Sequence, residues 1–210
     1  MLPAPRVDVQ LLDGVTGRKL PAQSVDRVKT FECSSGNEFY ISVDIERTRS
    51  DDQRVFTVIA KLDGDMIGYS FHCHGFMKQR CIFDGFPINN GRGRSMFKFN
   101  DMMVGSSTAK NDAIGTISID VHERGEIFTG ALSYTEGNSA PREGTEKPHA
   151  KFFENQRLST VGGSTVENKY SGLSAAYTCG ELLSTTTIRY DDSTHVSLRA
   201  SEQKKRKHCA

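Results

Sequence analysis

Apolar and polar residues alternate along much of the chain, in the period-two pattern of β-strands that bury one face. Segments rich in Gly, Asn and Asp separate the alternating stretches, as turns do between short strands. The pattern therefore predicts an all-β fold, an antiparallel β-sandwich that is jelly-roll-like or related to one. The alternating stretches are residues 7–11, 39–46, 97–99, 116–121, 188–190 and 196–198.

A hairpin is the clearest local element of the predicted fold. Asp63-Gly64 separates residues 54–62 from residues 65–73, and this dipeptide suits a two-residue type I′ turn. Such a turn also sets the register, and a slip by one residue would scatter the aromatic side chains over both faces. The predicted register gives the hairpin one apolar face that pairs Phe56 with Phe71, Val58 with Tyr69, and Ala60 with Ile67.

Helical spacing is rare, and we expect at most one short helix. The best candidate is residues 173–183, whose small and apolar side chains could share a face, although Gly180 disfavours a helix. Residues 161–172 are rich in Gly and Ser and predict a loose connection between strands. Residues from about 135 to 150 combine Gly, Asn, Ser, Pro and charge, and predict a mobile loop.

The chain has 210 residues, of which 36% are hydrophobic, so we expect one β-sandwich domain over residues 1–200. Residues 201–210 carry no apolar side chain before Cys209 and predict a disordered basic tail. The 27 basic and 26 acidic residues give a net charge of +1. Without the basic cluster, residues 1–203 carry −3, so the charge of the body does not indicate a polyanion-binding surface. The cluster is Lys204, Lys205, Arg206 and Lys207.

Several absences indicate an intracellular protein, in the cytoplasm or the nucleus. The first residues contain no apolar segment of a signal peptide, and no apolar run is long enough to cross a bilayer. The five cysteines are odd in number and form no CxxC motif, and no N-x-S/T glycosylation acceptor occurs. We therefore expect free thiols, no secretion by a signal peptide and no membrane partner.

The order of these signals carries a family resemblance over residues 7–130. A strand with the spacing GxxFxIxV precedes the Asp-Gly hairpin, then a strand with FxF and a strand with GTIxIxV follow. This order resembles an uncharacterised β-rich domain family found largely in fungal proteins. The resemblance implies a β-fold and no established activity. The residues that carry it are Gly36, Phe39, Ile41, Val43, Asp63, Gly64, Phe97, Phe99, Gly115, Ile117, Ile119, Val121 and Arg124.

His72-Cys73-His74 is the first candidate for chemistry. On a strand, His72 and His74 point to the same face and could supply two ligands to a metal such as zinc. A third ligand would have to come from His122 or His149. The other interpretation is an exposed polar strand, because the hairpin register places both histidines on the solvent face. Cys73 points the opposite way, toward the core.

Residues 89–94 form a Gly-rich basic segment, NNGRGR, that could bind an anion or nucleic acid. Asn90, Arg92 and Arg94 are the candidate binding residues. No Gly-Lys-Ser/Thr follows, so the segment is not a P-loop. The ordinary interpretation is a solvated turn, in which Asn and Gly accommodate positive φ angles.

The C-terminal cluster Lys204, Lys205, Arg206 and Lys207 fits a nuclear localisation signal or an arm that binds nucleic acid, and also a simple solubilising end. No GxSxG motif and no recognisable Cys/His spacing indicates catalysis. We therefore expect a non-catalytic module without a cofactor that binds a protein partner or copies of itself. The alternatives are a nuclear, nucleic-acid-associated protein and a metal-dependent enzyme at His72 and His74.

Overall fold

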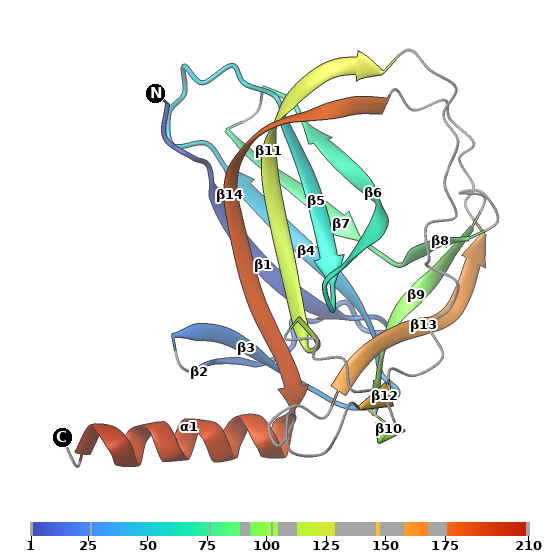
Figure 1. Cartoon of the computed structure of the whole chain (residues 1–210), viewed down its shortest axis with the longest axis vertical. Coiled ribbons are helices and arrows are strands. Elements are labelled where there is room, and N and C mark those ends of the chain that lie inside the picture. Colours follow the sequence, from blue (N-terminus) through green and yellow to red (C-terminus); the bar gives the residue numbers. More distant parts are fainter. Residues whose placement is uncertain are drawn as a thin grey trace.

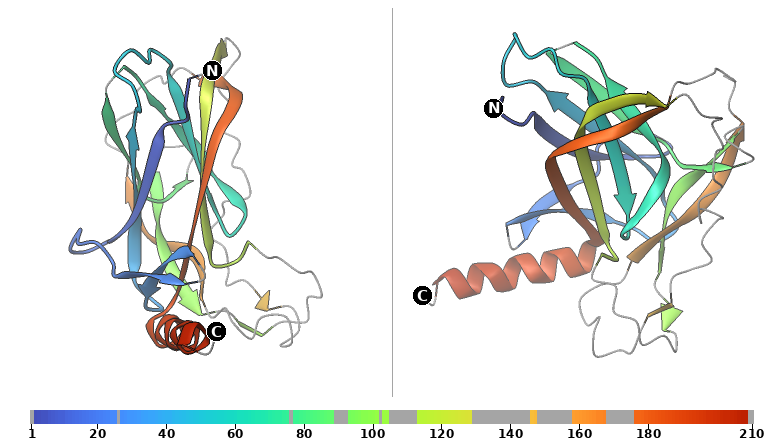
Figure 2. Two further views of the ribbon diagram at one scale, coloured as in Figure 1. Left: turned by 90° about the vertical axis from the view of Figure 1, so that its left-hand side faces the viewer. Right: turned by 45° about the horizontal axis from the view of Figure 1, so that its top comes forward.

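The structure is a computed structural model, and it shows an all-β, sandwich-like fold with one helix (Figure 1). Two six-stranded sheets face each other, and Figure 2 shows the helix projecting beyond one end of them. The residues that the structure describes are 2–25, 27–75, 77–88, 93–101, 103–104, 113–128, 146–147, 158–167 and 176–208.

The first sheet contains the strand at the start of the chain. Its main path runs β1, β4, β9 and β13, while β7 pairs with β4 and β8 pairs with β9. All of these pairs are antiparallel, as predicted. The strands are β1 (Arg6–Asp13), β4 (Glu38–Glu46), β7 (Lys78–Phe83), β8 (Phe86–Ile88), β9 (Gly93–Asp101) and β13 (Leu158–Glu167).

The second sheet has the order β2, β3, β14, β11, β5 and β6. Its pairs are antiparallel except β3 with β14, which is parallel. A separate parallel pair joins β10 (Met103–Val104) to β12 (Glu146–Lys147). The strands of the second sheet are β2 (Ala22–Val25), β3 (Val28–Cys33), β5 (Phe56–Leu62), β6 (Asp65–Cys73), β11 (Thr116–Phe128) and β14 (Ala176–Asp192).

The core consists of the inward-facing side chains of both sheets, as the alternation predicts. Phe39 of β4 stacks on Phe99 of β9 with ring centroids 4.0 Å apart, and Phe99 also contacts Tyr190 of β14 at 5.2 Å. Full burial of each such ring contributes about 2 to 3 kcal/mol relative to exposure. The largest buried side chains are Phe31, Phe39, Phe56, Phe83, Phe97, Phe99 and Tyr190.

The predicted hairpin is present, but its register is wrong beyond the turn. Asp63 and Gly64 have φ angles of 53° and 91°, which fit a type I′ turn, and Leu62 pairs with Asp65 as predicted. Farther along, Val58 pairs with Phe71 and not with Tyr69.

A bulge in β6 causes the shift in the hairpin register. Gly68 has a φ of 88°, a conformation that glycine adopts readily, and the pairing is irregular around it. Phe56 consequently pairs with Cys73. Because the shift is by two residues, the same side chains still face the core. The predicted inner face is therefore right although the predicted pairs along it are wrong.

The C-terminal part differs most from the sequence-based expectations. The helix expected within residues 173–183 is wrong, because residues 176–192 form the long strand β14. The loose connection expected at 161–172 is wrong for residues 161–167, which belong to β13 and pair with β9. Apart from β12, the expected mobile loop at about 135–150 lies outside the described residues.

The helix, α1 (Ser193–His208), replaces the strand expected at residues 196–198 and most of the tail expected to be disordered. It begins after Asp192, whose carboxylate accepts a hydrogen bond from the backbone N–H of Thr194 at 2.9 Å, as an N-cap does. Val196 is fully buried at its base, and the later Lys, Gln and Arg residues favour helix. In the part of the chain that is described, no helix is both long and apolar enough to cross a membrane.

Candidate functional site: an acidic pocket beside the N-terminal segment

The two histidines that the sequence proposed as metal ligands have different surroundings. His72 lies in β6 with its Nδ1 3.2 Å from Thr57 Oγ1, whereas His74 is exposed beyond the end of that strand. Burial and the charges of His74 and Arg124 lower the pKa of His72.

The proposed third ligands do not complete a metal site in the described residues. His122 and His72 flank Thr57 on either side of β5, so their backbones are about 10 Å apart across the sheet. His149 lies outside the described residues. Within the ranges given above, no cluster of three or more His, Cys, Asp or Glu side chains could hold a metal ion.

Arg94, proposed as an anion-binding residue, is engaged within the fold. It forms an ion pair with Asp84, and its guanidinium lies 4.5 Å from the ring centroid of Tyr69. The Tyr69 hydroxyl donates to Asp84 at 3.1 Å, and burial raises the pKa of that hydroxyl. Arg94 thus joins β9 to β6 and to the β7–β8 connection. Asn90 and Arg92 lie outside the described residues.

The basic cluster Lys204, Lys205, Arg206 and Lys207 belongs to the final turns of α1. Its role as a localisation signal stays a prediction.

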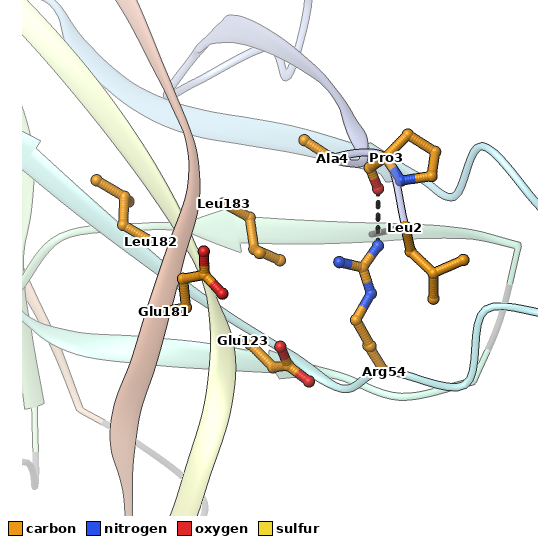
Figure 3. A pocket seen from close by; sticks show the side chains of 8 residues that line it. All are labelled: Leu2, Pro3, Ala4, Arg54, Glu123, Glu181, Leu182 and Leu183. Carbon is orange, nitrogen blue, oxygen red and sulfur yellow. Dashed lines mark hydrogen bonds between the residues drawn. The ribbon is translucent and has the colours of Figure 1, made fainter.

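A pocket of about 490 Å³ lies where the N-terminal segment runs beside β11 and β14 (Figure 3). The N-terminal segment and Arg54 form one side of the pocket. The carboxylates of Glu123 and Glu181 form the opposite side, as the close-up shows. The pocket is lined by Leu2, Pro3, Ala4, Arg54, Glu123, Glu181, Leu182 and Leu183.

An irregularity between β11 and β14 brings the two glutamates together. His122 pairs with Leu182 and Arg124 pairs with Cys179, with shifts of register between these pairs. Glu123 and Glu181 therefore occupy neighbouring positions on adjacent strands.

Gly180 permits the close approach of the two strands. A Cβ atom at this position would stand 2.9 Å from the Glu123 carbonyl oxygen, so a larger residue would push the strands apart. His122 makes a further contact between the two strands, because its Nδ1 lies 3.2 Å from the Gly180 carbonyl oxygen. Such bulges commonly re-aim side chains beside functional sites.

The charge of the pocket is unbalanced. Asp52 accepts two hydrogen bonds from Arg54, at 3.0 Å from Nε and 2.8 Å from Nη2. This pairing raises the pKa of Arg54, to which the charges of Glu123 and Glu181 add, and it lowers the pKa of Asp52. Asp52 also pairs with Arg47 at 3.6 Å, so it is shared between two arginines. The charged residues that line the pocket itself are Arg54, Glu123 and Glu181, and this lining therefore carries one more negative than positive charge.

Neither glutamate forms an ion pair or a side-chain hydrogen bond to any residue of the described ranges. Arg54 Nη2 instead donates to the Pro3 carbonyl oxygen at 2.7 Å, which fixes the N-terminal segment beside the pocket. The carboxylates are therefore available to a cationic ligand.

The rim of the pocket is apolar. Leu182 and Leu2 are 52% and 36% exposed. An apolar rim around a negative centre suits lysine or arginine, because these side chains lay an apolar stem along a surface and place the charge beyond it.

The sequence pattern did not reveal this pocket. Glu181 lies in the segment expected to be helical, and Glu123 lies two residues beyond the alternating stretch 116–121, so the local pattern singled out neither. Their proximity results from the pairing of β11 with β14, which no local signal predicts. Two like charges at facing positions of paired strands would be the signal, once the register is known.

The fold defines an all-β, sandwich-like protein. No protein family, curated protein or solved structure matches the chain. The resemblance to the fungal β-rich domain family therefore stays a prediction.

Proposed function

We propose that this chain is a non-catalytic interaction module that assembles with copies of itself. The pocket at Glu123 and Glu181 of one copy binds the basic C-terminal end of α1 from the next copy. The observation that carries the proposal is a pair of glutamates, Glu123 and Glu181, that form no ion pair or side-chain hydrogen bond with any described residue and line a pocket with an apolar rim.

Charge complementarity favours the basic end of α1, residues 204–207, as the ligand of the pocket. Residues 204–207 carry four positive charges, and residues 1–203 carry a net charge of −3. Each copy thus contains both a donor and an acceptor for the same contact. Complementary charges also accelerate association and align the partners.

The position of α1 favours a contact between the pocket of one copy and the helix end of another copy over a contact within one chain. The chain runs about 40 Å along β14 from Glu181 to the start of α1, at about 3.3 Å per residue. The N-terminus and α1 lie at opposite ends of the sandwich (Figures 1 and 2). A contact from pocket to helix end is heterologous, and it builds a linear chain of copies unless the rotation closes a ring.

The first experiment measures mass in solution by sedimentation velocity, with reductant present so that thiols do not cross-link. We expect oligomers that grow with protein concentration at about 0.05 M salt and dissociate at about 0.5 M salt, because salt screens exposed charges. A protein that remains monomeric over the whole concentration range at low salt contradicts self-assembly.

The second experiment measures binding of a labelled peptide of residues 201–210, with Cys209 replaced by serine, by fluorescence anisotropy. The double variant Glu123→Gln/Glu181→Gln should weaken binding by at least about tenfold, which corresponds to about 1.4 kcal/mol. The matched control Glu32→Gln/Asp101→Asn removes the same charge from β3 and β9 and should leave the affinity nearly unchanged. Equal losses in the two variants would show that only net charge matters.

A further inference from the structure

Cys73 and Cys81 bring two thiols together inside the sandwich. Cys73 ends β6 of the second sheet, and Cys81 lies in β7 of the first sheet. Their Sγ atoms are 3.4 Å apart, and both residues are 2% exposed. The two sulfurs therefore meet across the interface between the sheets, linked along the chain only by residues 74–80.

We propose that Cys73 and Cys81 are a redox-active pair, which a hydroperoxide oxidises to a disulfide that joins the two sheets. The proposal rests on this juxtaposition and is independent of self-assembly through the pocket. Formation of the disulfide requires the sulfurs to approach from 3.4 Å to about 2.05 Å.

The surroundings assign different roles to the two thiols. The hydrogen bond between the two sulfurs, in which either atom could be the donor, and the charge of Arg47 lower the pKa of Cys73, against the effect of burial. The same hydrogen bond and burial raise the pKa of Cys81. Arg47 is itself buried, with its guanidinium 4.5 Å from the ring centroid of Phe56, the strand partner of Cys73. Because the cationic Arg47 lies beside Phe56, the strand partner of Cys73, the proposal takes Cys73 as the attacking thiolate and Cys81 as the resolving thiol.

The reaction consumes one hydroperoxide for each disulfide. The Cys73 thiolate attacks one peroxide oxygen, the O–O bond breaks, and Cys73 becomes a sulfenic acid while an alcohol or water leaves. The Cys81 sulfur then attacks the Cys73 sulfur, the S–O bond breaks, and water leaves with the proton of the Cys81 thiol. The two thiols lose two electrons in total, and the peroxide gains them.

The other described cysteines lack this arrangement. Cys33 is buried, and its Sγ lies 3.7 Å from the Phe31 carbonyl oxygen. Burial and the charge of Asp191 raise the pKa of Cys33. Cys179 is exposed, and burial of part of its side chain raises its pKa as well. Neither sulfur contacts a second sulfur among the described residues, so these two cysteines serve as internal comparisons.

The test uses the full chain with Cys179→Ser and Cys209→Ser, which prevents cross-links between copies. After treatment with hydrogen peroxide, the intact mass should fall by two hydrogens, and a non-reducing peptide map should join the Cys73 and Cys81 peptides. The melting temperature should rise by a few degrees, because the cross-link closes a short loop and restricts the unfolded chain. Dithiothreitol should reverse both changes.

Two further substitutions in the Cys179→Ser/Cys209→Ser chain distinguish the attacking thiol from the resolving thiol. Cys81→Ala should abolish the cross-link and leave Cys73 as a sulfenic acid that dimedone captures, whereas Cys33→Ala should leave the cross-link intact. The proposal fails if the folded protein keeps its mass under conditions that fully oxidise Cys179 in the unmodified chain. It also fails if the peptide map joins Cys33 to either partner.

Discussion

Two groups of carboxylates in this molecule have opposite surroundings. Asp63, in the β5–β6 turn, is 1% exposed and accepts hydrogen bonds from the Gly115 N–H at 2.7 Å, the Tyr190 hydroxyl at 2.7 Å and the Thr160 N–H at 2.9 Å. The pocket glutamates, Glu123 and Glu181, have no such partners among the described residues. A carboxylate surrounded by donors holds the fold, and one left to solvent is available to a ligand.

Asp63 also connects the two sheets. It follows β5 of the second sheet, while Thr160 belongs to β13 of the first sheet. The Thr160 hydroxyl donates to the Tyr190 hydroxyl at 2.8 Å, which closes a ring of hydrogen bonds at this end of the sandwich. Aspartate suits the site because it tolerates the φ of 53° that the turn requires.

Replacement of Asp63 should have the largest effect on stability. Asp63→Ala leaves buried donors of Gly115, Thr160 and Tyr190 without their acceptor, which should lower the free energy of unfolding by about 4 kcal/mol. Urea denaturation measured by circular dichroism checks this value. A loss below about 1 kcal/mol would mean that water replaces the carboxylate and that the site is not a structural link between the sheets.

Asp52 should give an intermediate effect that depends on pH. Its pKa is lowered in the folded protein, mainly by the hydrogen bonds from Arg54, so the pair stabilises the fold above the unfolded pKa of about 4 and loses this contribution as the pH falls through the lower folded value. Unfolding free energies measured between pH 7 and 3 should therefore fall less steeply in Asp52→Asn than in the wild type. Parallel profiles for the two proteins would contradict the assignment.

The glutamates should have the smallest effect on stability. Glu123→Gln/Glu181→Gln should change the free energy of unfolding by less than about 0.5 kcal/mol, or raise it slightly, because like charges on adjacent strands repel each other. Thermal melts at low and high salt measure the difference. A large loss would show that these carboxylates hold the strands together, and the contrast with Asp63 would disappear.

Much of the sandwich is determined locally. Alternation identifies the strands and their inner faces, and the Asp-Gly dipeptide locates the hairpin turn, because side-chain direction in a strand and turn geometry depend on neighbouring residues. The predicted inner face of the hairpin is correct even where the bulge at Gly68 changes the residue pairs. The same reasoning placed Cys73 in the core.

Only the tertiary structure decided which distant residues meet. The β11–β14 pairing joins Glu123 to Glu181, and the packing of the sheets joins Cys73 to Cys81 and Asp63 to Thr160. The end of the chain became a helix since Val196 docks at its base, although the local alternation at residues 196–198 favoured a strand. Strand pairing and sheet packing are contacts between segments far apart in sequence. Their partners are selected by burial and shape over the whole fold, which no local pattern encodes.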